Sequence, residues 1–135
     1  MTTTPTQIKE GLQVRLATIT GLRSYAYQPD NLNAPFAWPM LQSITYNGAM
    51  NGGMVTYVFT VSVVVGRSAE RTAQSALDGY IAYDGTTSIR AAIEGDKTLG
   101  GVASTLIVES AGNISTMDGN DATYLMVDFN VVVYV

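Results

Sequence analysis

The sequence predicts an α+β domain: a mixed, mainly antiparallel sheet with an N-terminal helix and a central helix pair packed on it. Residues 54–65 and 123–135 have apolar side chains at every second position, as strands do. Residues 5–19 and 68–95 have apolar side chains at helical spacing. The expected order is α-β-β-β-α-α-β-β, and the chain length predicts a single domain over residues 1–135.

The first helix is expected at Pro5–Ile19. Thr4 suits the N-cap, proline suits the first helical position, and Gln7 can complete a capping box. We expect Gly21 to end this helix as a C-terminal glycine. Residues 22–27 should then form a short strand.

A loop is expected at 28–39, because prolines at positions 29, 35 and 39 should break regular pairing. Strands are expected at 40–46 and 54–65, joined by the glycine-rich turn 47–53. The second of these strands is apolar on one face. Its other face is small, uncharged and β-branched, which predicts packing against a helix or a neighbouring subunit.

Two helices are expected in the middle of the chain, at 68–81 with Ser68 as a cap and at 86–95. Thr86 or Thr87 can cap the second, and Gly95 should end it. Because a helix of about two turns is unstable alone in water, its apolar side chains must dock on the rest of the protein. These side chains are Ile89, Ala92 and Ile93.

The last part of the chain should form a hairpin. Gly100 and Gly101 allow a turn into a strand at 102–110, a polar loop should follow at 111–122, and the final strand should span 123–135.

The composition narrows the function classes. Only 13% of residues are charged and 47% are hydrophobic, which favours an assembly subunit over a monomer coated with Ser, Thr and Asn. From Asp84 onward there are seven acidic residues against Arg90 and Lys97, a charge of −5 within a net −4. Such a surface repels phosphate, so nucleic-acid binding is not expected.

No segment resembles a signal peptide or membrane span, so we expect a soluble protein made inside a cell.

The residues for common chemistry are missing. The chain has no cysteine and no histidine, which removes disulfides, thiolate metal sites and the commonest general base. In "DGTTSIRAAIEGDKTLGG" the glycines follow the predicted helix, unlike in a phosphate-binding loop, and "DGND" lacks most ligands of a calcium loop. The acid pairs Asp78/Asp84 and Glu94/Asp96 are expected at helix ends and on the surface. We therefore expect no enzyme activity, cofactor or metal.

The segments "RSAERTAQSALDGYI", "DGTTSIRAAIEGDKTLGG" and "YLMVDFNVVVY", after a capped helix and a Pro-rich loop, resemble the tail terminator and related neck proteins of long-tailed bacteriophages. The resemblance is strongest over 67–135, and the polar stretch "ESAGNISTMDGND" departs from it. It implies a virion protein, assembled in the host cytoplasm, that forms a ring, typically a hexamer. That ring would end polymerisation of the tail tube and dock the head–tail connector, while DNA passes through its lumen without specific binding.

Partner contacts are expected in the loops 28–39 and 111–122. Trp38, the sole tryptophan, is either a core side chain under its loop or an interface anchor, and methionines beside the glycine-rich turn pose the same choice. The candidate interface residues are Asp30, Trp38, Met50, Met54, Asp118 and Asp121. Alternatives are another neck or tail-tube subunit, or a small monomeric binding module that uses "NAPFAWP".

Overall fold

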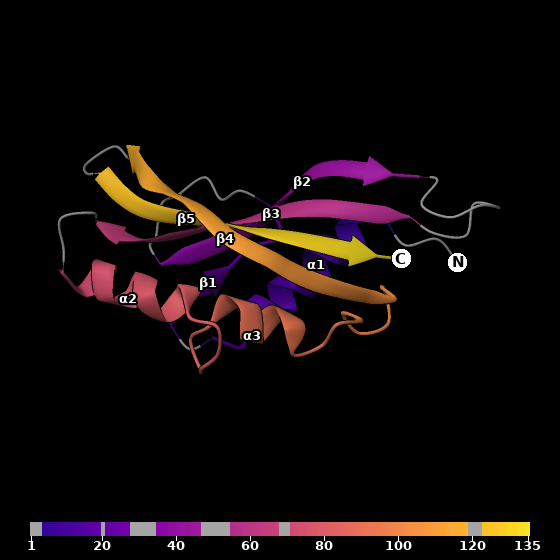
Figure 1. Cartoon of the computed structure of the whole chain (residues 1–135), viewed down its shortest axis with the longest axis horizontal. Coiled ribbons are helices and arrows are strands. Elements are labelled where there is room, and N and C mark those ends of the chain that lie inside the picture. Colours follow the sequence, from indigo (N-terminus) through magenta and orange to yellow (C-terminus); the bar gives the residue numbers. More distant parts are fainter. Residues whose placement is uncertain (1–3, 20, 28–34, 47–54, 68–70, 119–122) are drawn as a thin grey trace.

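The computed structural model contains one five-stranded sheet with three helices along one side of it (Figure 1). It describes residues 4–19, 21–27, 35–46, 55–67, 71–118 and 123–135. The elements are α1 (Pro5–Leu16), β1 (Arg23–Ser24), β2 (Phe36–Thr45), β3 (Thr56–Arg67), α2 (Arg71–Ile81), α3 (Ile89–Glu94), β4 (Thr105–Asp118) and β5 (Thr123–Tyr134). Among the described helices, none is long and apolar enough to span a membrane.

The sheet order is β1-β2-β3-β5-β4. β1 runs parallel to β2, and every other neighbouring pair is antiparallel. The predicted α+β class, the element order and the mixed, mainly antiparallel sheet are confirmed.

The core lies between the helices and the inner face of β3 and β5, the two central long strands. Alternate residues of both strands point into it, as the period-two pattern predicts. Its helical members are Ile8, Leu12, Leu16, Ala73, Leu77, Tyr80, Ile89 and Ile93. The opposite face of the sheet carries only a smaller cluster, and no described helix covers it.

The N-terminal helix begins as predicted. Thr4 Oγ1 accepts the Gln7 backbone N–H at 3.3 Å, and Gln7 Oε1 accepts the Thr4 N–H at 2.9 Å, which completes the capping box. The predicted end at Ile19 is wrong, because the helix stops at Leu16 and the next residues form tighter turns. Gly21 turns the chain into β1 with φ 87° instead of capping the helix. The strand expected at 22–27 is reduced to two residues.

Pro39 does not break the sheet, contrary to the prediction. It lies inside β2, opposite Val61 of β3. Because Val55 and Val135 exchange both backbone hydrogen bonds, at 2.9 and 3.4 Å, the odd-numbered β3 residues before the register shift at Val64/Gly66 bond β5 and the even-numbered ones bond β2. Pro39 faces an odd-numbered residue, so its missing N–H falls on the outer side of β2, where proline is tolerated.

The second and third helices pack as predicted, with a different cap. Ser88, not Thr86 or Thr87, is the N-cap of α3: its hydroxyl accepts the Ala91 N–H at 3.1 Å and donates to the Ala82 carbonyl at 2.6 Å. Gly95 ends the helix, as expected. Ser68, the expected cap of α2, lies outside the described residues.

An arginine of α1 holds the end of α3. Arg15 Nε donates to the Ala92 carbonyl at 2.9 Å, and the same carbonyl accepts the Gly95 N–H at 3.4 Å at the helix end. A side chain at Gly95 would collide with the Arg15 guanidinium. This glycine therefore gives Arg15 room to reach the helix.

The last hairpin is longer than predicted. β4 starts at Thr105, not at residue 102, and continues to Asp118, so the loop expected at 111–122 is wrong up to that residue. Pairing shifts at Val108/Ser110 and Gly112/Ser115 mark irregularities that interrupt the period-two pattern. β4 is an edge strand with largely exposed side chains, which explains its polar sequence.

The docking of α3 yields a stability prediction. Ile93 is fully buried, so Ile93→Asp should lower the free energy of unfolding by about 4 kcal/mol, because it places a charge in the core. Ile114→Asp, at a 52% exposed position, is the matched control and should change it by less than about 0.5 kcal/mol. Denaturant unfolding measures both. Equal effects would show that α3 does not dock.

Candidate assembly interface

Two of the six candidate interface residues lie in the described part of the chain. Trp38 is in β2, and Asp118 is the last residue of β4. Asp30, Met50, Met54 and Asp121 lie outside the described residues. The structure does not bring Trp38 and Asp118 into one site, since they lie on non-adjacent strands.

Trp38 belongs to the small cluster on the face of the sheet that no helix covers. The cluster contains Phe36, Trp38, Val64 and Tyr124, and the Trp38 and Phe36 rings stack with centroids 5.4 Å apart. Trp38 is 5% exposed, and its Nε1–H has no acceptor among the described residues. A buried donor without an acceptor is destabilising. Trp38 is therefore a packed side chain of a strand, not of a loop, with one polar group still to be satisfied.

Asp118 closes the last hairpin. Its Oδ1 accepts the Thr123 hydroxyl at 3.2 Å, and the residue is exposed. The contact ties the end of β4 to the start of β5. Asp118 therefore has a local structural role at this end of the sheet.

The face of the sheet that no described helix covers also carries the polar side chains Ser62 and Asp128. Ser62 donates a hydrogen bond to Asp128 Oδ1 at 2.9 Å. Beside them is a shallow hollow of about 280 Å³ over Gly112, bordered by Thr60, Ser110 and Asn130. The four long strands contain three acidic residues and, as their one cation, Arg67. The four long strands are thus poor in positive charge.

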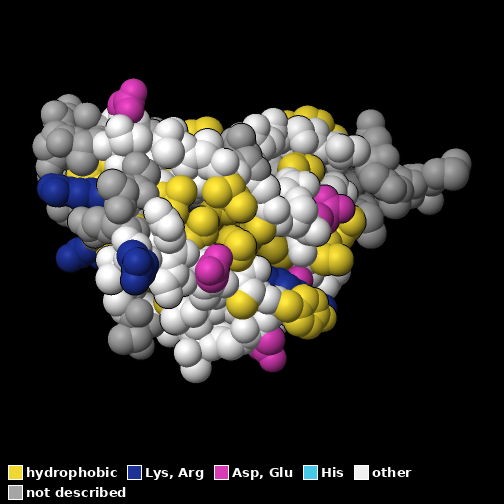
Figure 2. Space-filling view, turned by 60° about the vertical axis from the view of Figure 1, so that its left-hand side comes forward, with side chains coloured by type: hydrophobic (Ala, Val, Ile, Leu, Met, Phe, Trp, Pro, Cys, Tyr) yellow, Lys and Arg dark blue, Asp and Glu magenta, His cyan; other side chains and the backbone are white. Residues whose placement is uncertain are grey.

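A groove of about 250 Å³ follows the edge strand β4. Hydrophobic side chains gather on the side of the molecule seen in Figure 2, with acidic and basic groups beside them. The chain after α2 and the strand β4 form the two walls of the groove, and Phe129 of β5 also lines it. The main apolar members are Ile81, Tyr83, Val108 and Ala111. Tyr83 is 74% exposed.

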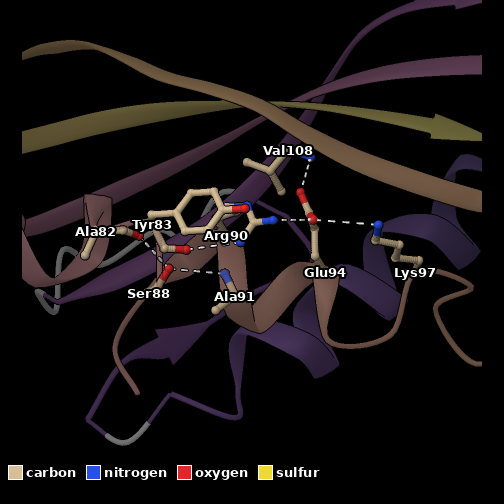
Figure 3. Close-up of polar contacts among 8 residues, drawn as sticks. All are labelled: Ala82, Tyr83, Ser88, Arg90, Ala91, Glu94, Lys97 and Val108. Carbon is tan, nitrogen blue, oxygen red and sulfur yellow. Dashed lines mark hydrogen bonds and ion pairs between the residues drawn. The ribbon is translucent and has the colours of Figure 1, made fainter. Parts of the chain in front are cut away.

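Arg90 of α3 lines this groove and is held by a group of polar contacts around Glu94 (Figure 3). Glu94 Oε2 accepts the backbone N–H of Val108 in β4 at 3.0 Å. Its Oε1 accepts from Arg90 at 3.1 Å and lies 3.9 Å from Lys97 Nζ. The Arg90 guanidinium stacks on the Tyr83 ring, 3.9 Å from its centroid.

Glu94 differs from the prediction that it is a surface group, because its side chain is only 10% exposed. The spacing of Arg90 and Glu94 indicates an ion pair on one helix face. Nothing in the sequence indicates that the carboxylate also reaches a strand 14 residues away. The sequence also does not predict the β4 groove, because the strand expected from it ends at residue 110, before Ala111, which lines the groove.

Among the residues that the structure describes, two groups have shifted pKa values. Hydrogen bonds from the Thr98 hydroxyl, then from the Gly100 and Thr98 backbone, hold the pKa of Asp96 below its ordinary value of 3.8. Burial raises the pKa of Tyr80, a core residue. Neither group lies in the β4 groove.

The site geometry suits contact with another chain. In the described ranges no three residues of the His, Cys, Asp or Glu types come together as a metal site. What the described surface offers is a long strand edge, an apolar groove and an uncovered sheet face. No protein-family model and no curated protein matches the sequence.

The contact between Glu94 and β4 can be tested by substitution. Glu94→Ala should lower the free energy of unfolding by about 1–3 kcal/mol, because the Val108 N–H loses its acceptor. Glu94→Gln keeps an acceptor oxygen and loses only the ion pairs, so it should cost about 1 kcal/mol or less. Denaturant unfolding of both variants checks this. Equal losses would mean that the hydrogen bond to Val108 contributes nothing.

Asp96 predicts a pH dependence. Because its pKa is lowered in the folded protein, its carboxylate stabilises the fold above pH 3.8, and this contribution is lost as the pH falls through the folded pKa. Asp96→Asn should therefore lower the Tm at pH 6, and the difference from wild type should shrink toward pH 2. Thermal unfolding across this range measures it. A difference that grows on acidification would contradict the assignment.

Proposed function

We propose that this chain is a virion structural protein, a tail terminator whose copies form a ring at the head-proximal end of a bacteriophage tail tube. The observation that carries the proposal is a sheet left open by its own chain. Helices cover one face, while the described residues leave the other face and long parts of both edges without a covering element. A strand edge of this kind is a template for another chain.

The ring, a hexamer in this proposal, ends polymerisation of the tube and joins it to the head–tail connector protein. The partners are therefore sister copies, the tail tube protein and the connector, in a virion assembled in the host cytoplasm. The resemblance of the 67–135 segments to tail terminators supports this assignment. The proposal gives the chain no catalytic step, cofactor, metal or membrane contact.

The charges of the strands fit the passage of DNA through such a ring. With Glu109, Asp118 and Asp128 against Arg67 in the four long strands, a lumen lined by this sheet would not attract phosphate groups. DNA could then move through without specific binding. A lumen rich in Lys and Arg would instead bind the DNA by attracting its phosphate groups.

Native mass spectrometry and electron microscopy test the proposal directly. The purified chain should give discrete rings, and particles made without it should show tails of uncontrolled length or tails without heads. Rings together with normal tails in its absence would favour another neck or tail-tube subunit. A strict monomer at high concentration, and also in the presence of tail tubes, would favour a small binding module.

A substitution pair separates the sheet side from the helix side. Met40 is 45% exposed on β2, at the margin of the uncovered face, and Val14 is 65% exposed on α1. Met40→Asp should abolish ring formation, because a neighbouring copy would desolvate the new charge. Val14→Asp, the matched control, should leave rings intact.

Light scattering measures the masses of both variants, and circular dichroism verifies their folding. If Val14→Asp disrupts the ring and Met40→Asp does not, assembly runs through the helices, and the use of the open sheet is wrong.

A further inference from the structure

The backbone at the β4 edge has hydrogen-bonding groups directed away from the sheet. Odd-numbered residues of β5 bond β3, as the paired bonds of Val55 and Val135 show, so even-numbered residues bond β4. Five β4 residues lie opposite odd-numbered ones and therefore direct N–H and C=O outward: Leu106, Val108, Ala111, Thr116 and Asp118. The bond from Val108 N–H to Glu94 confirms this direction.

The opposite edge of the sheet, on β2, also has backbone groups directed away from the sheet. Ala37, Pro39, Leu41 and Ile44 lie opposite odd-numbered residues of β3, so their backbone groups point away from it. The Ala37 carbonyl accepts the Tyr25 N–H at 3.0 Å, which confirms this direction. Beyond Ala37 no described strand pairs with β2 on this side.

Each edge has a blocked position followed by an open run. On β4 the Glu94 carboxylate already occupies the Val108 N–H, and the open positions beyond it are Ala111, Thr116 and Asp118. On β2 Pro39 has no N–H to offer, and the open positions are Leu41 and Ile44. The open run therefore offers three outward N–H groups on β4 and two on β2, and the blocked positions limit where another strand can start.

We propose that the open run of β4 in one copy pairs with the open run of β2 in the next copy, so that the sheet continues from subunit to subunit. This inference rests on the proposed ring and names the contact that closes it. Because the two edges lie on opposite sides of one sheet, the contact is head-to-tail, and a closed set of such contacts is a ring.

Charge favours β2 over a second β4 as the partner. An antiparallel pair of β4 strands that joined Ala111 to Thr116 would set Glu109 of each copy opposite Asp118 of the other. Like charges in that arrangement are destabilising. β2 has no charged residue. The acidic β4 edge therefore meets a neutral edge.

Proline substitutions test the pairing, because they remove an outward N–H without removing a bond within the subunit. Thr116→Pro should block β4 and Ile44→Pro should block β2, each converting rings into monomers. Thr116→Ala and Ile44→Ala are the matched controls. They lose the same side-chain packing but keep the N–H, so they should retain rings in native mass spectrometry.

Mixing the two proline variants distinguishes the partners. A Thr116→Pro chain keeps its β2 edge and an Ile44→Pro chain keeps its β4 edge, so the mixture should form a 1:1 dimer and nothing larger. An Ile44→Pro chain that dimerises alone would show β4–β4 pairing and overturn the proposal. Rings that persist in both proline variants would overturn it too, while leaving the proposed ring in place.

Hydrogen exchange of the unsubstituted chain tests the same pairing, and it does so even if a proline variant does not fold. Ring formation should slow exchange of the Ala111, Thr116, Leu41 and Ile44 amides about tenfold or more relative to dilute monomer. Unchanged exchange in rings would contradict the edge pairing. A chain that never forms rings, alone or on tail tubes, would instead contradict the proposed function.

Discussion

The alternation of side chains along β3 and β5 is the constraint on which the rest of this structure depends. These two strands lie at the centre of the sheet, and their inward residues, among them Phe59, Val61, Val131 and Val133, are fully buried beneath the helices. Because every second residue must point the other way, the same strands create a second face with Ser62, Asp128 and Asn130 on it. All three helices pack into the one core. The described helices thus cover one face of the sheet and leave the other face uncovered.

Much of this fold could be predicted from local sequence, and the failures have a common cause. The capping box of Thr4 and Gln7 and the strands β3 and β5 depend on neighbouring residues or a simple period, and all were found. Pro39 and β4 were misjudged because their conformation depends on a partner strand. A proline fits a strand only if its nitrogen faces the free side, and that is decided by the register with β3. Irregularities in β4 likewise hide its pairing with β5.

The candidate site was less predictable than the fold. Trp38 was expected to pack under a loop or to anchor a partner, and the structure places it in a packed strand cluster. The groove along β4 depends on Glu94 reaching Val108 and on Tyr83 stacking with Arg90. Those contacts join segments whose relative positions are set by the core. Spacing within one helix could reveal the Arg90–Glu94 pair and nothing further.

The short helix α3 joins the layers of the molecule. Ile89 and Ile93 enter the core, Glu94 holds the edge strand, and Arg15 reaches the helix end from α1. A segment of six residues gains almost no stability from its own hydrogen bonds, so these contacts with both neighbours are what make it helical.

The Ser62–Asp128 hydrogen bond has a consequence for how copies can stack. Two molecules that met sheet face to sheet face would enclose two carboxylates in a layer of low dielectric, where removing a charged group from water is costly. Sandwich dimers and the dry interfaces of fibrils are therefore disfavoured for this protein, and the face stays hydrated. A hydrogen-bonded acid on this face therefore opposes face-to-face stacking of these sheets.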